Sequence, residues 1–449
     1  MPPALTEPQP AQIEPLYVRL PAGRRKANGL DSNGRRRDEV AADQRRRLQR
    51  AMIEAVAAHG YAATTTRGLS KLAGVSKEHM YKQFPGKESY FLATYDTIVE
   101  RGVERIGAAY RSPGAWQAKL RAAFDAYAAE VVAEPGAAQL ALVEVLGAGP
   151  VALARMRGTR LISERIVSAS FSEAPDGVAL PPLIVKGIVC GIERITRHLL
   201  LAGGVQELPA LADELLAWAL SYRSPAAAAL AAHHEAPVRC WPPARVENDR
   251  ARILRCAAQI AAVKGYAQLS PARIACDAGV TEARFDELFE SAEECFLDAL
   301  DRLGLETLVC AASASRSSED RLAGVHRGIV ALMEHVASNP VLVGVAFVEI
   351  FAVGPAGIKR RHRLLGQFTD LLARSVPRSQ RPSDLVGEAS IGAILGIVHH
   401  HVTRGATHRL PGLADYATYL ALAPVIGGEA AVGVILAERA AGAQLISAA

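Results

Sequence analysis

The sequence predicts an all-α protein that consists of two tandem copies of one unit. Apolar residues recur at helical spacing, as in residues 47–58, where Leu48, Met52 and Val56 stand at positions i, i+4 and i+8. No segment alternates β-branched and polar residues between turn signals, so no strand is expected. Short motifs in the first half of the chain return in the second half at a fixed separation, which is typical of a duplication.

The repeat extends over about 150 residues in one register. The matching motifs are Gly60-Tyr61-Ala62 with Gly265-Tyr266-Ala267, Ala73-Gly74-Val75-Ser76 with Ala278-Gly279-Val280-Thr281, Glu134-Pro135 with Asn339-Pro340, Val143-Glu144 with Val348-Glu349, Gly149-Pro150 with Gly354-Pro355, and Gly187 and Gly191 with Gly392 and Gly396; all are 205 residues apart. Leu208-Pro209 and Leu410-Pro411 are 202 residues apart, so the first copy is three residues longer in the turn between its last two helices. These spacings predict the duplication of a whole protein of about 200 residues rather than a short-period solenoid.

The composition divides the chain into six parts. Residues 1–43 are rich in proline and arginine and predict a disordered basic arm, while Pro225, Pro237, Pro242 and Pro243 mark a linker. The predicted parts are the arm (1–43), a helix-turn-helix domain (44–110), a helical domain (111–223), the linker (224–247), a degenerate acidic helix-turn-helix domain (248–310) and a second helical domain (311–449).

The composition also excludes several classes of protein. The six cysteines form no C-x-x-C pair, which argues against a disulfide framework or a zinc ribbon. The longest apolar run, residues 340–358, contains Glu349, two prolines and three glycines, so a buried helix is a better interpretation than a membrane span. With no signal-peptide pattern at its start, the chain is expected to be cytoplasmic and not in a membrane.

Residues 45–95 have the layout of a helix-turn-helix. Gly60 ends a first helix, the run Thr64-Thr65-Thr66 provides N-caps for a second helix over residues 67–73, Gly74 makes the turn, and Ser76 caps a third helix over residues 77–84. The apolar contacts between the second and third helices are expected from Leu69, Leu72, Val75, Met80 and Phe84.

Residues 60–91, GYAATTTRGLSKLAGVSKEHMYKQFPGKESYF, resemble the DNA-binding domain of TetR-family transcriptional regulators. The shared features are the Thr pair, the A-G-V-S turn, a Tyr followed three positions later by a Phe, and the Lys-Glu pair that opens the fourth helix. The helical remainder of each copy fits the family's effector and dimerisation domain in length and helicity. The resemblance implies a double-stranded DNA operator, a small-molecule effector and, as the family's majority behaviour, repression.

The charge of the first helix-turn-helix agrees with DNA binding. Residues 45–95 contain nine Lys or Arg and three acidic residues, a net charge of +6 that would attract the phosphate backbone. Lys77 and His79, near the start of the third helix, are the candidates for base contacts. The candidates for phosphate contacts are Thr65, Ser76, Tyr81, Lys82 and Lys87, and Arg47 and Thr66 are further candidate DNA-binding residues. Glu78 departs from the family, which has glycine or another small residue there.

The second copy keeps the apolar frame and loses the basic surface. Residues 250–300 contain six Lys or Arg and eight acidic residues, a net charge of −2. The replacements on the DNA-facing side are Glu282 for Lys77, Asp286 for Tyr81, Glu287 for Lys82 and Ala292 for Lys87. Because these carboxylates would face phosphates, the second domain is predicted to fold without binding DNA.

The last two helices of each copy are the expected dimerisation elements. Gly187, Gly191, Gly392 and Gly396 suit a close approach of helices, so the two copies are predicted to form an intrachain pseudo-dimer. Two such chains would then meet on a palindromic operator as a homodimer, or a monomer would bind one half-site.

The remaining candidates concern ligands and metals. Glu144 and Glu349 lie in apolar helices, either as ligand contacts or partners of an arginine such as Arg194, or as carboxylates at a surface helix end. His399, His400 and His401 point in different directions on one helix, so neither they nor His408 predict a metal site. No catalytic motif and no cofactor motif is present, so the chain is not expected to be an enzyme. The alternative to a regulator is an adaptor or ligand-binding protein that no longer binds DNA.

Overall fold

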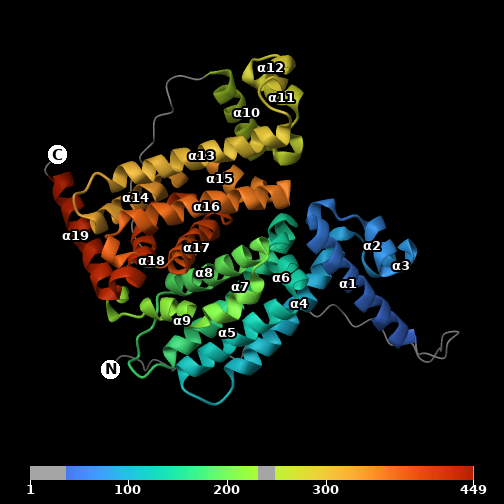
Figure 1. Ribbon diagram of the computed structural model, residues 1–449, viewed down its shortest axis with the longest axis horizontal. Helices are drawn as coiled ribbons and strands as arrows, with labels where there is room; N and C mark the ends of the chain where they lie inside the picture. Colours follow the sequence, from blue (N-terminus) through green and yellow to red (C-terminus); the bar gives the residue numbers. More distant parts are fainter. Residues whose placement is uncertain (1–36, 231–247, 448–449) are drawn as a thin grey trace, which may run out of the picture.

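The computed structural model describes residues 37–230 and 248–447, and this part of the chain forms helices and turns with no strand (Figure 1). The helices of the first half are α1 (Arg37–Ala63), α2 (Thr66–Ala73), α3 (Lys77–Gln83), α4 (Lys87–Tyr110), α5 (Trp116–Ala133), α6 (Pro135–Leu142), η1 (Glu144–Gly147), α7 (Pro150–Ser172), α8 (Pro182–Ala202), η2 (Val205–Leu211), α9 (Ala212–Ser221) and η3 (Pro225–Ala229). The all-α prediction is confirmed.

The helices of the second half are α10 (Asp249–Lys264), η4 (Tyr266–Gln268), α11 (Pro271–Ala278), α12 (Glu282–Asp286), α13 (Ala292–Ser315), α14 (Arg321–Ser338), α15 (Pro340–Phe347), η5 (Glu349–Val353), α16 (Pro355–Ser375), η6 (Arg378–Gln380), α17 (Asp384–Val402), η7 (Thr407–Arg409), η8 (Pro411–Leu413), α18 (Ala414–Ile426) and α19 (Gly428–Ser447). The α-helices of this half follow the same order as those of the first half as far as α18, and α19 has no counterpart among the described helices of the first half. Helices α2, α4, α5 and α6 begin and end 205 residues before α11, α13, α14 and α15.

Helices α8 and α17 run along each other at the centre of the molecule (Figure 1). Glycine is required at this contact, because a Cβ on Gly191 would lie 2.7 Å from the Ala389 carbonyl and one on Gly396 would lie 2.3 Å from the Cys190 Cβ. The four helices α8, α9, α17 and α18 pack against one another within one chain.

Aromatic hydroxyls tie the same helices together. The Tyr222 hydroxyl on the first half donates to the Leu420 carbonyl at 2.9 Å, and the Tyr419 hydroxyl donates to the Tyr222 carbonyl at 2.8 Å. Trp218 Nε1 donates to the Ser390 hydroxyl at 3.1 Å. These groups are buried, so their hydrogen bonds specify one alignment of the two halves.

Two predicted boundaries differ from the structure. Helix α1 begins at Arg37, inside the predicted arm. Most of residues 37–47 are good helix formers, so they extend the predicted helix of residues 47–58 toward the N-terminus. At the other boundary, Ala227 and Leu230 are buried and the Tyr416 hydroxyl donates to the Leu230 carbonyl at 2.5 Å, so residues 224–230 are packed. The rest of the predicted arm and linker, residues 1–36 and 231–247, lies outside the described residues.

Among the described residues, only α17 is by itself long and apolar enough to cross a membrane, and the pair α14 and α15 with η5 would qualify only as a span bent by 94°. Half of the apolar stretch of α17 is buried, mainly against α8. This is the position of a core helix, so the helix is weak evidence for a membrane span.

Candidate nucleic-acid interface

Side-chain caps fix the helices of the first helix-turn-helix. The Thr65 hydroxyl accepts from the Gly68 amide at 3.1 Å and starts α2 at Thr66, one residue earlier than predicted. Gly74 takes the left-handed conformation with φ 61° and ends α2, and the Ser76 hydroxyl accepts from the His79 amide at 3.2 Å and starts α3. Gly60 breaks the first helix with φ 77°, as predicted.

The core under these helices differs from the prediction at one residue. Leu69, Met80 and Phe84 are buried as expected, but Leu72 is 51% exposed. The buried face of α2 is centred between Leu69, Ser70 and Ala73, and Leu72 lies roughly 110° around the helix from that centre. Leu72 is therefore a surface residue and not part of the core.

The outward face of α3 presents polar groups to solvent. Lys77, His79, Tyr81 and Lys82 are all exposed. Lys82 forms an ion pair with Glu78 at 2.8 Å, and the Tyr81 hydroxyl lies 3.3 Å from the Thr66 hydroxyl. Within the described residues, Lys77 and His79 form no ion pair or side-chain hydrogen bond, so these two side chains are available for an outside partner.

Arg47 and Lys87 have internal roles that the sequence did not reveal. Arg47 Nη2 donates to the carbonyls of Ala73 at 2.8 Å and Gly74 at 2.9 Å, where α2 ends. Lys87 Nζ donates to the Tyr61 carbonyl at 3.0 Å and lies 4.3 Å from the centre of the Tyr61 ring. Cations at helix C-termini satisfy carbonyls that have no helical partner, so both side chains hold the domain in shape. Burial lowers the pKa of Lys87.

Glu144 joins the first helix-turn-helix to the rest of its half. Its side chain is 4% exposed, and its Oε2 accepts from the Tyr61 amide at 2.8 Å, just after the break at Gly60. Burial raises the pKa of Glu144, and the hydrogen bond from Tyr61 opposes this shift. The predicted surface position of Glu144 is therefore wrong, and so is its pairing with Arg194, which forms an ion pair with Glu388 at 2.9 Å instead.

Glu349 makes the equivalent contact in the second half. Its Oε2 accepts from the Tyr266 amide at 2.7 Å. Glu349 is only partly buried, whereas Glu144 is buried. We call each of these contacts, Glu144 with Tyr61 and Glu349 with Tyr266, a carboxylate clamp. Each clamp holds one helix-turn-helix, and the glutamate of the second clamp is more exposed to solvent.

The first helix-turn-helix also rests on the second half. A Cβ on Gly60 would lie 3.2 Å from the ring of Pro355, the first residue of α16, whose start lies beside the end of α1 in Figure 1. Around Gly265, at the matching position, such a Cβ would meet only Glu349 within 4 Å among the described residues. The second half thus supports the first domain through a contact that Gly265 does not make.

The second helix-turn-helix has the same caps and a different surface. Ser270 and Thr281 accept from the amides of Arg273 and Arg284, and Gly279 is left-handed with φ 66°. Helix α12 has five residues where α3 has seven. The exposed side chains on α12 include Glu282 and Asp286, and Glu287, which follows the helix, is also exposed. The only arginine on α12, Arg284, is paired with Asp249 and Glu287.

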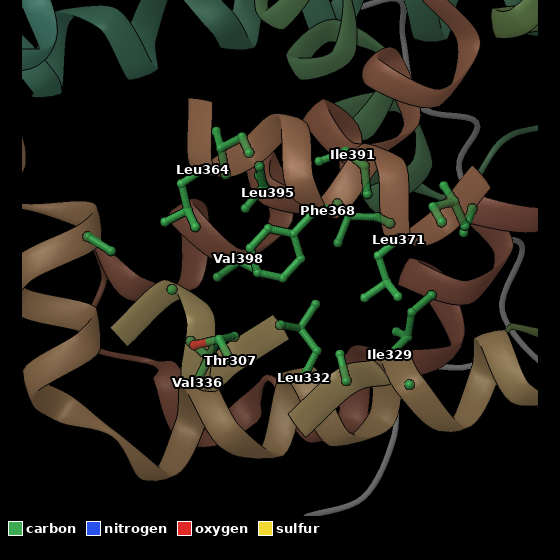
Figure 2. Close-up of a pocket in the computed structure, with 18 of the residues that line it drawn as sticks. Thr307, Ile329, Leu332, Val336, Leu364, Phe368, Leu371, Ile391, Leu395 and Val398 are labelled. Atoms are coloured by element: carbon green, nitrogen blue, oxygen red, sulfur yellow. The ribbon is translucent and has the colours of Figure 1, made fainter. Parts of the chain in front are cut away.

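Each half also contains an apolar cavity in its helical domain. The cavity of the second half, about 120 Å³, lies between α13, α14, α16 and α17 and is lined by Leu332, Phe368 and other apolar residues, with Arg361 as its one charged residue (Figure 2). The cavity of the first half, about 220 Å³, includes Tyr127, Arg101 and Glu130 among its lining residues. Cavities of this kind suit small apolar ligands.

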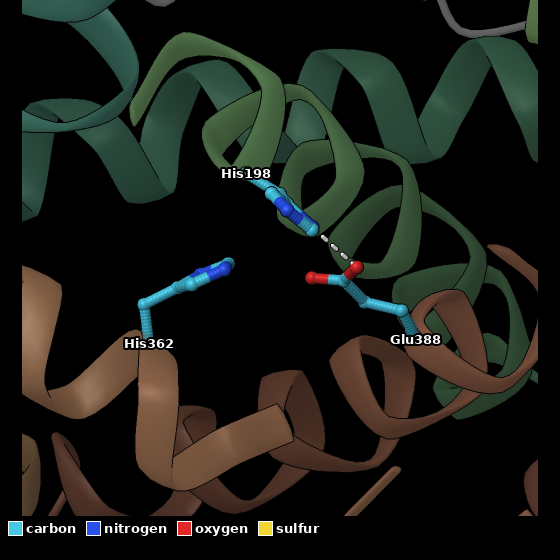
Figure 3. A group of neighbouring side chains, drawn as sticks. All are labelled: His198, His362 and Glu388. Carbon is cyan, nitrogen blue, oxygen red and sulfur yellow. Dashed lines mark hydrogen bonds and ion pairs between the residues drawn. The ribbon is translucent and has the colours of Figure 1, made fainter. Parts of the chain in front are cut away.

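The histidines of α17 do not come together as a metal site. The His401 ring lies 2.9 Å from the Ile397 carbonyl of its own helix. A different group, His198, His362 and Glu388, has ligand atoms within 4.8 Å of one another (Figure 3). This group could not be predicted from the sequence, because its members come from three separate helices, α8, α16 and α17.

Comparisons with known proteins identify the first domain. The sequence model of the family "Bacterial regulatory proteins, tetR family" matches residues 50–94, which include α2 and α3. Among curated proteins, none matches the chain.

Several solved structures of regulators are similar to part of the chain. FadR, a fatty acid degradation regulator from Bacillus halodurans, is 17% identical, covers 39% of this chain and 97% of its own, and has a TM-score of 0.36. A TetR-like transcriptional regulator from Rhodococcus sp. RHA1 is 16% identical with coverages of 38% and 93% and a TM-score of 0.34. FadR from Bacillus subtilis, solved with stearoyl-CoA, is 15% identical with coverages of 39% and 97% and a TM-score of 0.36. The family match therefore identifies residues 50–94 as a helix-turn-helix DNA-binding segment of the kind found in the tetR family of bacterial regulatory proteins.

Proposed function

We propose that the chain is a sequence-specific repressor whose first helix-turn-helix alone contacts the operator. The observation that carries this proposal is the surface of α3, where Lys77 and His79 are exposed without a partner in the described residues. At the matching places of the second domain stand Glu282 and Arg284, and Arg284 is already paired with two carboxylates. An acidic surface repels phosphates, so the second domain contributes no DNA contact.

Within the first domain, the proposed contacts fall into two sets. Lys77 and His79 contact base edges in the major groove, because residues at the start of a recognition helix point into it. Thr65, Thr66, Ser76, Tyr81 and Lys82 contact phosphates through hydroxyl or ammonium groups. Arg47 and Lys87, whose cationic groups already bond to backbone carbonyls, position these residues and add positive charge.

We further propose that the two halves arose by duplication of a whole regulator. The 205-residue offset of four helix pairs and the two carboxylate clamps support this origin. The proposed domains are residues 44–110 and 248–310 for the helix-turn-helix domains and 111–223 and 311–449 for the effector and dimerisation domains. Because α8, α9, α17 and α18 pack inside one chain, each chain supplies one DNA-binding domain, and two chains meet on a palindromic operator.

The apolar cavities are the proposed sites of the effector. Each is lined by residues of one half, and the ligand would release DNA by changing how that half holds its helix-turn-helix. The clamp at Glu144 is the connection through which such a change would reach the first domain. This role is a regulatory one, and no enzymatic step is proposed.

Selection of genomic fragments by the purified protein, followed by sequencing, tests the proposal. We expect enrichment of a palindromic site and its loss in a Lys77→Ala variant, with the second-domain variant Glu282→Ala as the matched control. Light scattering with and without the selected site then measures whether one or two chains bind. If no site is enriched at low salt, the protein is an adaptor that no longer binds DNA.

A further inference from the structure

A small cavity of about 60 Å³ lies between the two halves. Its lining includes four arginines and one histidine and no acidic residue; these are Arg160, Arg194, Arg197, Arg361 and His399. Arg160, Arg194 and Arg197 come from the first half, and Arg361 and His399 come from the second half. Arg194 and His399 stand at matching positions 205 residues apart, so the cavity lies where the two halves face each other.

Carboxylates behind the cavity balance only part of this charge. Glu193 pairs with Arg160 at 2.5 Å and with Arg197 at 3.1 Å, and Glu388 pairs with Arg194 at 2.9 Å. Arg361 has no carboxylate partner among the described residues. Its Nε donates to the Ala346 carbonyl at 3.1 Å, and its guanidinium lies against the rings of Phe347 and Phe351. Four guanidinium groups thus share two carboxylates.

Two buried nitrogen atoms at this site, Arg194 Nε and His399 Nε2, have no hydrogen-bond partner among the described residues. Arg194 as a whole is 6% exposed. Burial, together with the nearby charges of Arg194 and Arg197, lowers the pKa of Arg361 to about 9. Unpaired buried donors and uncompensated cations both cost free energy, and an anion in the cavity would recover it.

The neighbouring group of His198, His362 and Glu388 is the alternative, because its ligand atoms lie close enough to bind a cation (Figure 3). The charges around it oppose this use. One oxygen of Glu388 is paired with Arg194 and the other lies 2.5 Å from His198 Nδ1. Burial and, after it, the charge of Arg194 lower the pKa of His362 to about 4. The guanidinium of Arg194 next to this group repels a further cation.

We propose that the cavity between the halves binds an anionic oxygen group, with Arg361 and Arg194 as its principal donors. Arginine is the residue best suited to such a group, because its planar guanidinium donates two parallel hydrogen bonds to a phosphate or carboxylate. Two sources of this group fit the site. One is a free inorganic oxyanion. The other is the acidic end of an apolar molecule in the apolar cavity of the second half, since that cavity and the one between the halves share Arg361, Leu365 and Leu395 as lining residues.

The cavity lies next to the two segments that carry the carboxylate clamps. Leu146 of η1 and Phe351 of η5 line the cavity, and the same two segments carry the clamps Glu144 and Glu349. The bound anion would therefore stabilise the contact between the two halves next to the residues that hold both helix-turn-helix domains. This inference concerns ligand binding between the halves and does not depend on DNA binding.

Thermal unfolding of the full chain tests the proposal with two probes, inorganic phosphate and octanoate, each against chloride at equal ionic strength. We expect at least one probe to raise the Tm by about 2 °C or more at millimolar concentration. The variant Arg361→Gln should lose this rise and should have a higher Tm than the wild type without the probe, because its neighbours no longer repel an uncompensated charge. Arg374→Gln, on the exposed side of the same helix, is the control and should respond as the wild type does.

The pattern of responses identifies the source of the anion. A response to phosphate alone supports a free oxyanion, and a response to octanoate alone supports an apolar molecule with an acidic end. Isothermal titration of both variants separates loss of binding from loss of folding. The proposal is overturned if neither probe binds, if Arg361→Gln binds as tightly as the wild type, or if Zn²⁺ stabilises the protein while both anions do not.

Discussion

The two helix-turn-helix domains share their internal construction and differ in their surfaces. In both, a hydroxyl caps each of the two short helices, a left-handed glycine makes the turn, and a glutamate accepts from the amide of a tyrosine, at 2.8 Å from Tyr61 and 2.7 Å from Tyr266. On the outside, Lys77 and Lys82 of the first domain face solvent where the second has Glu282 and Glu287. Folding thus depends on caps and core, while the partner depends on a few exposed charges that can change independently.

The largest loss of DNA affinity is expected when the first domain is given the surface charges of the second. In the triple variant Lys77→Glu, Tyr81→Asp and Lys82→Glu, two cations are lost and three anions would face DNA. We expect operator affinity to fall by about 100-fold or more, because each phosphate contact and each base contact contributes separately. Competition gel shifts at fixed salt measure the loss. Circular dichroism should show an unchanged fold, since all three side chains are exposed.

Alanine variants of Glu144 and Glu349 compare how much each clamp contributes to the free energy of unfolding. Glu144→Ala removes the acceptor of the partly buried Tyr61 amide and should lower the free energy of unfolding by about 1–3 kcal/mol. Glu349→Ala should cost less, because Glu349 is partly exposed and water can replace its oxygen. Glu144→Gln keeps a carbonyl acceptor and serves as the control. Denaturant unfolding gives the three values, and equal costs for the two alanine variants would contradict the difference in burial.

The glycines before the two tyrosines distinguish the domains in a different way. Gly60 and Gly265 have φ values of 77° and 93°, so alanine at either site is strained by roughly 1–2 kcal/mol. Gly60→Ala should cost more than Gly265→Ala, since its Cβ would also lie 3.2 Å from the Pro355 ring. Combining Gly60→Ala with Pro355→Ala should recover that excess. Unfolding experiments on the single and double variants measure it, and a simple sum of the two single effects would mean that the contact has no energetic role.

Most of the fold could be predicted from the sequence because it depends on local signals. Serine and threonine are typical of helix N-caps, and they occur at Thr65 and Ser76. Glycine is typical of left-handed turns and close helix contacts, and it occurs at Gly74 and Gly191. The burial of Leu72 was predicted wrongly. Helical spacing shows which residues share a face, but in the short helix α2 it does not show which side of Leu69 the buried face extends to.

The contacts between distant segments could not be predicted in the same way. Glu144 bonds to Tyr61 across 83 residues, and Arg361 joins a cluster whose other arginines belong to the other half. The sequence shows that such residues are polar in apolar surroundings, but it does not show their partners. The exposed surface of α3 follows from local signals, but whether Lys77 and His79 contact bases is still a prediction.

The smallest expected effect tests whether the second domain is silent. The variant with Glu282→Gln and Glu287→Gln removes two exposed carboxylates, one at the start of α12 and one just after its end, and leaves the cap at Thr281 intact. If this domain lies away from the operator, affinity should change by less than about twofold, and the slope of log affinity against log salt should stay constant, because that slope counts the phosphates that the protein neutralises. A tighter complex with an unchanged slope would mean that the acidic face lies near enough to DNA to repel it. A steeper slope would mean that the second domain contacts phosphates once its carboxylates are gone, and would place both domains on the operator.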